Sequence, residues 1–184
     1  MQPLEPEKPL LTPRLQLEPL VAAHAPLLYP LLQDATLYRF IPQEPPGSVE
    51  ALTARYHKLA VRHSPDGSET WLNWALRLRT SDDYAGTLEV TIHADSTALL
   101  AYMIFPAFQH RGFAREGCLR VLEHLCSVYK VRRVVAEIDT RNTASIALVA
   151  SLGFVRIALH PSADFFKGAV SDEYRYEYEP PQQE

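Results

Sequence analysis

The sequence predicts an α+β fold in three layers, with a mixed, mostly antiparallel seven-stranded sheet flanked by about four helices. Three observations lead to this prediction. Residues 72–105 contain three successive runs with strand character, which are typical of an antiparallel meander. A helical segment and another strand follow over 112–138, and that order requires a crossover to a parallel neighbour. Two further strands are expected between 154 and 178.

The N-terminal third is expected to hold one strand and two helices. Residues 14–18 alternate apolar and polar side chains, which predicts the strand that opens the sheet. Residues 22–33 have a helical pattern that Pro30 should kink or shorten. Ser48 is suited to cap a second helix that runs to about His63.

The meander consists of strands over 72–79, 87–93 and 97–105. In the first two runs, apolar and polar residues alternate, so each strand should bury one face. The third run is more uniformly apolar, which predicts burial on both faces.

Local signals also define the C-terminal half. A helix is expected to begin near Gly112, because apolar residues recur on one face after it. Residues 131–138 are rich in β-branched residues and predict a strand. Asn142 can cap the last helix, which Gly153 should end. The last two strands are expected over 154–160 and 171–178, the second with Tyr174, Tyr176 and Tyr178 on one face.

Length and composition indicate one globular domain. The chain has 184 residues, of which 47% are hydrophobic and 22% charged. A single domain is expected over 10–178, between a disordered N-terminal extension, 1–9, and a disordered tail, 179–184, because both ends are polar and proline-containing.

Charge and hydropathy exclude several classes of partner. The net charge of −4 argues against general nucleic-acid binding and against binding to anionic membranes. No apolar run approaches the roughly 20 residues that span a bilayer, and Met1–Glu5 lacks the pattern of a secretion signal. These observations predict a cytoplasmic protein.

The cysteines and histidines predict no disulfide and no metal site. Cys118 and Cys126 fall in one expected helix, about 12 Å apart along its axis, which is too far for a disulfide. They are interpreted as structural thiols. The seven histidines show no metal-ligand spacing.

Gln109-His110-Arg111-Gly112-Phe113-Ala114 stands where a strand should pass into a helix. Backbone N-H groups at a helix N-terminus bind phosphate, and Gly112 and Ala114 would allow close approach. This spacing also fits a plain strand-turn-helix corner that contains a glycine.

Glu137 and Asp139 should project from the same face at the end of one strand. Such a pair can include a general base whose pKa is raised by burial or by its neighbour. Solvated charges at the sheet edge are the alternative. Asn142 can likewise serve only as a helix cap.

Taken together, these motifs over about Thr12 to Tyr178 resemble the GCN5-related N-acetyltransferase (GNAT) family, in particular the branch that acetylates the N-termini of ribosomal proteins. The resemblance implies a single acetyltransferase domain over 10–178, a GNAT fold with splayed central parallel strands, and acetyl-CoA as donor. The implied CoA-binding residues are Gln109, His110, Arg111, Gly112, Phe113 and Ala114 for the pyrophosphate, the backbone of Met103, Ile104 and Phe105 for the pantetheine arm, and Asn142 and Ser145 on the opposite wall.

The resemblance also implies catalytic roles. Glu137, five residues before Asn142, is the first candidate to deprotonate the amine, and Glu89 is the second. Many relatives protonate the departing thiolate with a tyrosine, but that position here is Val149. Ser145, Tyr102 or solvent are the candidates to take its place.

The acceptor implied is a small-molecule amine or a peptide or protein N-terminus, held between the first two helices and a loop over 162–170. The sequence does not distinguish acetyl-CoA from a longer acyl-CoA as donor. The protein is expected to be a monomer or homodimer. The alternatives are a non-catalytic acyl-CoA-binding or regulatory module and a plain structural α/β protein.

Overall fold

A computed structural model of the chain describes residues 8–180, so most of the expected N-terminal extension and tail lies outside the described residues. The strands are β1 (Leu10–Leu11), β2 (Leu15–Pro19), β3 (Glu69–Leu78), β4 (Tyr84–His93), β5 (Thr97–Ile104), β6 (Arg133–Asp139), β7 (Val155–Phe166) and β8 (Ala169–Tyr178). The α-helices are α1 (Ala25–Leu28), α2 (Val49–Leu59), α3 (Phe113–Ser127) and α4 (Thr143–Ser151), and the 3₁₀ helices are η1 (Ala22–His24), η2 (Leu31–Gln33), η3 (Ala35–Tyr38) and η4 (Pro106–Phe108).

All eight strands form one mixed sheet in the order β1-β2-β3-β4-β5-β6-β8-β7. Among the strands of residues 8–180, β5 and β6 alone are paired in parallel, on either side of the α3 crossover. The predicted architecture is therefore confirmed, with one strand more than expected. The additional strand is β1, which pairs Leu10 with Leu17, so the segment predicted to open the sheet is its second strand.

Prolines and caps shape the helices as expected. The predicted helix over 22–33 is divided into η1, α1 and η2, and the break falls at Pro30. The side chain of Ser48 accepts a hydrogen bond from the N-H of Ala51 and caps α2, which ends at Leu59, earlier than expected. The cap of α4 is Asn142, and Gly153 follows its end with φ +90°.

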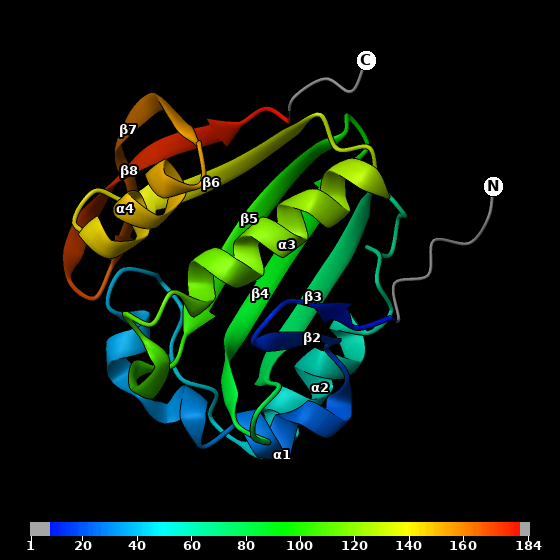
Figure 1. Cartoon of the computed structure of the whole chain (residues 1–184). Helices are drawn as coiled ribbons and strands as arrows, with labels where there is room; N and C mark the ends of the chain where they lie inside the picture. Colours follow the sequence, from blue (N-terminus) through cyan, green and yellow to red (C-terminus); the bar gives the residue numbers. More distant parts are fainter. Residues whose placement is uncertain (1–7, 181–184) are drawn as a thin grey trace.

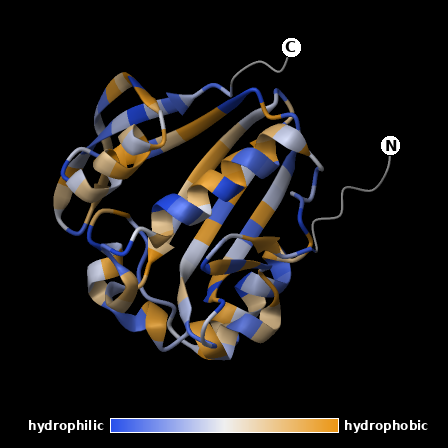
Figure 2. Cartoon of the chain, viewed as in Figure 1, coloured by the Kyte–Doolittle hydropathy of each residue, from blue (hydrophilic) through white to orange (hydrophobic). Residues whose placement is uncertain are grey.

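The helices cover the two faces of the sheet (Figure 1), with α3 and α4 on one face and the segment from α1 to α2 on the other. Along α3, hydrophobic and hydrophilic residues alternate (Figure 2), and its buried stripe includes Cys118, Val121 and Leu125. Cys118 and Cys126 lie in this one helix as free thiols. The tyrosines of β8 pack on the same face of the sheet.

The prediction that the third meander strand is buried on both faces is wrong. Ala98 and Leu100 of β5 are buried, but Leu99 is 37% exposed and Ala101 is exposed. Only the end of this strand, at Met103 and Phe105, packs against the cluster that includes α1 and α2. Those helices are short, so they leave the middle of that face open.

The segment expected as a loop over 162–170 is mostly extended, and this prediction is also wrong. Strands β7 and β8 form a long hairpin closed by Lys167 and Gly168, both with positive φ. A two-residue turn with this geometry matches the twist of the flanking strands. A register shift between His160 and Asp164 bends β7.

Candidate active site

The corner between β5 and α3 leaves a helix N-terminus open. Gly112 is the N-cap residue of α3, with φ +79°, and no side chain among the described residues caps the helix. The first helical hydrogen bond runs from the N-H of Glu116 to the carbonyl of Gly112. In the part of the chain that the structure describes, the N-H groups of Phe113, Ala114 and Arg115 have no recorded protein acceptor, so the corner suits an anion.

Arg14 holds this corner from the start of β2. Its Nε donates to Glu116 at 2.6 Å, its Nη1 donates to the carbonyl of Arg111 at 2.9 Å, and its guanidinium lies 4.5 Å from the ring centre of Phe113. Burial opposes the charge of Glu116, but hydrogen bonds from Thr12 and Arg14 outweigh it and lower the pKa of this carboxyl. From the sequence, Arg14 is expected only to begin the strand over 14–18, with no role at this corner.

The backbone at the end of β5 is only partly available to a ligand. The side-chain amide of Gln109 donates to the carbonyl of Ile104 at 2.9 Å and ties the corner to the strand. Phe105 donates its N-H to Ala85, and its carbonyl accepts from Phe108, so both of its backbone groups are engaged. The N-H of Phe105 is thus engaged by the protein, as is the carbonyl of Ile104, and a role of Met103, Ile104 and Phe105 toward a ligand stays a prediction.

A gap opens where β5 and β6 separate. Their pairing ends at Leu99 and Val135, although β5 continues to Ile104 and β6 to Asp139. The predicted splay of the central parallel strands is thus present.

The α4 helix begins at the end of β6 and forms the second wall of this gap. The side chain of Asn142 accepts from the N-H of Ser145 at 3.2 Å, which confirms the predicted cap. The hydroxyl of Tyr102 reaches across from β5 and donates to the carbonyl of Ser145 at 3.3 Å. Burial raises the pKa of Tyr102, so its hydroxyl stays protonated. Val149 is fully buried one turn further on.

The two carboxylates of β6 share a face, as predicted, but their environments differ. Asp139 is buried and forms a two-point ion pair with Arg141, and the hydroxyl of Ser171 donates to it at 2.7 Å. These contacts lower the pKa of Asp139 to about 2 despite its burial, so the possibility of a raised pKa is wrong for this residue. Glu137 is 45% exposed and lies 3.3 Å from Arg175.

Glu173 of β8 is the carboxylate in this cluster whose pKa is raised. It is paired in register with Asp139, and burial raises its pKa together with the charges of Glu137, Asp164 and Asp139. Sequence reasoning missed it. The signal was present, because tyrosines on one face of this strand place Glu173 on the other. The second candidate base, Glu89, is on β4, and its carboxylate lies 3.6 Å from the guanidinium of Arg55 on α2.

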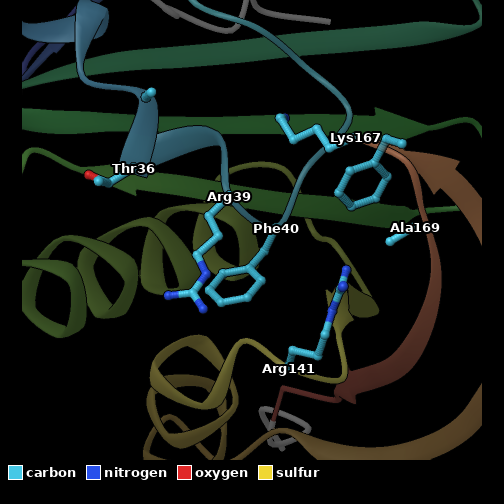
Figure 3. A pocket seen from close by; sticks show the side chains of 8 residues that line it. Thr36, Arg39, Phe40, Arg141, Lys167 and Ala169 are labelled. Carbon is cyan, nitrogen blue, oxygen red and sulfur yellow. The ribbon is translucent and has the colours of Figure 1, made fainter.

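A cavity of about 760 Å³ lies where η3, the loop between β6 and α4, and the β7–β8 turn converge. Figure 3 shows its side chains entering from these three segments. Its lining consists of Ala35, Thr36, Arg39, Phe40, Arg141, Phe166, Lys167 and Ala169. It adjoins the expected acceptor walls, and Arg141 links it to the end of β6.

Residues 8–180 contain neither a cluster of metal-binding side chains nor a membrane-spanning helix. Within this range, no group of His, Cys, Asp and Glu side chains is arranged to hold a metal ion. No helix in the same range is long and apolar enough to cross a membrane.

Residues 14–155 match the family described as the acetyltransferase (GNAT) domain. Among solved structures, the chain is similar to a protein from T. thermophilus described as an acetyltransferase, with 26% identity, a TM-score of 0.75, and coverage of 94% of this chain and 89% of that chain. None of the curated protein sequences compared with this chain matches it.

Two solved CoA complexes share the fold at lower identity. One is RimL, the ribosomal L7/L12 alpha-N-protein acetyltransferase with coenzyme A, at 19% identity and TM-score 0.84, covering 94% of this chain and 98% of that chain. The other is spermidine N-acetyltransferase from Vibrio cholerae with CoA and spermine, at 20% identity and TM-score 0.79, covering 91% of this chain and 96% of that chain. At these identities the likeness shows the fold alone.

Proposed function

This chain belongs to the GNAT acetyltransferase family, and we propose that it moves an acetyl group from acetyl-CoA to a primary amine by direct transfer. The observation that carries the proposal is the uncapped N-terminus of α3 beside the gap between β5 and β6. The acceptor is a small-molecule amine or a peptide N-terminus. The RimL and spermidine acetyltransferase structures are examples of both classes on this fold.

The residues present fit a CoA molecule. Free N-H groups at Phe113 and Ala114 suit the pyrophosphate, and Gly112 adds no side chain that would obstruct it. The exposed residues Gln109, His110 and Arg111 flank this corner. The β5 backbone at Met103 and Ile104 faces the pantetheine arm in the proposal, with Asn142 and Ser145 on the opposite wall. Bound there, acetyl-CoA supplies an activated acyl group.

Removal of a proton from the amine is assigned to Glu137. An ammonium group cannot attack an acyl carbon, so the site needs a proton acceptor, directly or through water. Glu137 is exposed at the end of β6, where the strands separate. Glu173 is the rival base, because its raised pKa brings it nearer to the pH at which a base works best.

Protonation of the departing thiolate is assigned to Tyr102 or Ser145. The Tyr102 hydroxyl meets the first turn of α4 from the opposite strand and carries a proton, although its raised pKa makes it a weaker acid than an ordinary tyrosine. Ser145 lies in the same turn and offers a second hydroxyl. A CoA thiol is acidic enough for solvent to complete this step if neither acts.

The test combines binding with turnover. Calorimetric titration with acetyl-CoA should show saturable binding to one site, and thiol release over a panel of amines should identify at least one acceptor. Mass spectrometry of that acceptor should show one added acetyl group. Absence of acetyl-CoA binding would contradict the proposal at its foundation.

A non-catalytic acyl-CoA-binding or regulatory module is the second candidate. The observation that favours it is Val149, which is fully buried where many relatives have a tyrosine. Tight binding of acetyl-CoA without turnover of any amine would support this module.

A further inference from the structure

The cavity between η3, Arg141 and the β7–β8 turn has an unusual charge for a site that receives amines. Its lining contains three cationic side chains, Arg39, Arg141 and Lys167, and no carboxylate. A protonated polyamine would meet like charge there, which is unfavourable. The charge of the cavity therefore carries information about the acceptor.

Lys167 contributes to the structure of the cavity wall through hydrogen bonds to the backbone. Its ammonium donates to the carbonyls of Tyr38 and Ile41, each at 2.7 Å, and to that of Gln43 at 3.0 Å. Glu44 lies 3.5 Å away. These bonds fasten the β7–β8 turn to the segment after η3, so the two sides of the cavity are held at a fixed separation.

Asp139 orients Arg141 but does not occupy all of its hydrogen-bond donors. Asp139 binds its Nε and one terminal nitrogen, and the side chain remains 48% exposed. Arg141 lies two residues after the end of β6 and directly before Asn142, so it joins the cavity lining to the segment that begins α4.

Arg39 is the cation in this lining that has no carboxylate partner among residues 8–180. Its recorded contact is with the ring of Phe40, 5.1 Å from the guanidinium. Phe40 and Phe166 add aromatic surface to the lining. A planar guanidinium free of an acidic partner is matched to a carboxylate, which it binds through two parallel hydrogen bonds.

We propose that the acceptor is an amine that also carries a carboxylate, which Arg39 binds while Arg141 supports it. This inference rests on the proposed acetyl transfer and narrows its substrate class. The carboxylate can belong to a free amino acid or to an acidic side chain near a peptide N-terminus. Both sources present the same chemistry to Arg39.

The experiment uses matched acceptors at saturating acetyl-CoA. One pair is phenylalanine and phenylalaninamide, and the other is a Ser-Asp-Phe peptide amide and its Ser-Asn-Phe counterpart. Spermine is the polycationic comparison. The full chain should favour the carboxylate member of at least one pair by about tenfold in kcat/KM, mainly through KM. The pair that shows the preference identifies the source.

Substitutions of Arg39 test whether this preference for a carboxylate arises in the cavity. Arg39→Gln should bring the kcat/KM of the carboxylate acceptor within about twofold of that of its carboxamide partner. Arg39→Lys should retain part of the preference, because lysine keeps the charge but lacks the planar fork of arginine. Arg132→Gln is the matched control, since Arg132 is an exposed arginine just before β6, away from this lining. It should keep the full preference.

Two results would overturn the inference while leaving acetyl transfer intact. They are equal or faster turnover of the carboxamides or spermine, and a carboxylate preference that Arg39→Gln does not change. Failure of the proposed function looks different, because then no amine in the panel is acetylated.

Discussion

In the proposed function, the CoA pyrophosphate binds at the corner formed by Gly112. The backbone of Gly112 is in the left-handed region, and an added Cβ would lie 3.4 Å from Arg14 Nη2. Gly112→Val should raise the dissociation constant for CoA by more than about tenfold, because the loop must shift away from the helix N-terminus. Calorimetric titration measures this change.

Gly67→Val is the control for backbone strain. Gly67 has a similar φ of +73°, with nothing within 4 Å of its added Cβ. Both variants should lose about 1–2 kcal/mol of stability, the cost of a left-handed L-residue. If Gly67→Val weakened CoA binding as much as Gly112→Val, the corner would not be the phosphate site.

Glu137 and Glu173 can be separated by their amide variants. Glu137→Gln should lower kcat/KM by about 100-fold, as expected for loss of a general base, and Glu173→Gln by less than about tenfold. Steady-state kinetics on the identified acceptor measures both. Glu123→Gln, at an exposed position of α3, is the control. The reverse order of effects would assign the base to Glu173.

At the scale of elements, Arg14 joins β2 to the N-terminal turn of α3. Arg14→Ala should raise the dissociation constant for CoA by about fivefold, because the Arg111 carbonyl and Glu116 lose their common partner. The loss of stability should be about 1 kcal/mol or less, since Arg14 is half exposed. Chemical unfolding and calorimetry give the two values.

Arg14→Lys distinguishes positioning from charge. A lysine keeps the positive charge near the phosphate site but cannot bind Glu116 and Arg111 through one planar fork. Affinity as low as that of Arg14→Ala indicates that Arg14 positions the loop. Affinity close to that of the unmodified chain would instead mean that its charge attracts the phosphates.

At the scale of the whole molecule, the buried Asp139 links stability to pH. Its pKa is about 2 when folded, below the ordinary value of 3.8, so its charge stabilises the fold fully above pH 3.8. That contribution is lost as pH falls from about 4 through 2. Asp139→Asn should therefore cost about 2 kcal/mol at pH 7, and the difference should shrink below pH 4.

Urea unfolding of both proteins at pH 7, 5, 4 and 3 measures this dependence. Asp83→Asn, in the exposed turn between β3 and β4, should follow the unmodified chain at every pH. A difference between Asp139→Asn and the unmodified chain that is as large at pH 3 as at pH 7 would contradict the role of the Asp139 charge.

Local chemistry let the sequence determine most of the fold. Pro30 breaks a helix because its ring clashes with the preceding turn, Ser48 and Asn142 cap helices through their own side chains, and Gly112 permits a left-handed corner. Each depends on residues within a few positions. The succession of strands along the chain, and the prediction that residues 109–114 bind phosphate at a helix N-terminus, rested on the same short-range signals.

The surroundings of the cavity lined by Arg39 and of the carboxylates near the end of β6 depend on contacts between different elements of the fold. Lys167 binds the carbonyl of Tyr38, 129 residues away, and the β7–β8 hairpin stands where the sequence predicts a loop. Asp139 is charged because Arg141 and Ser171 converge on it, whereas burial and the charges of neighbours on β6 and β7 raise the pKa of Glu173. Electrostatic energies depend on distance in space and on burial, which spacing along a chain does not encode.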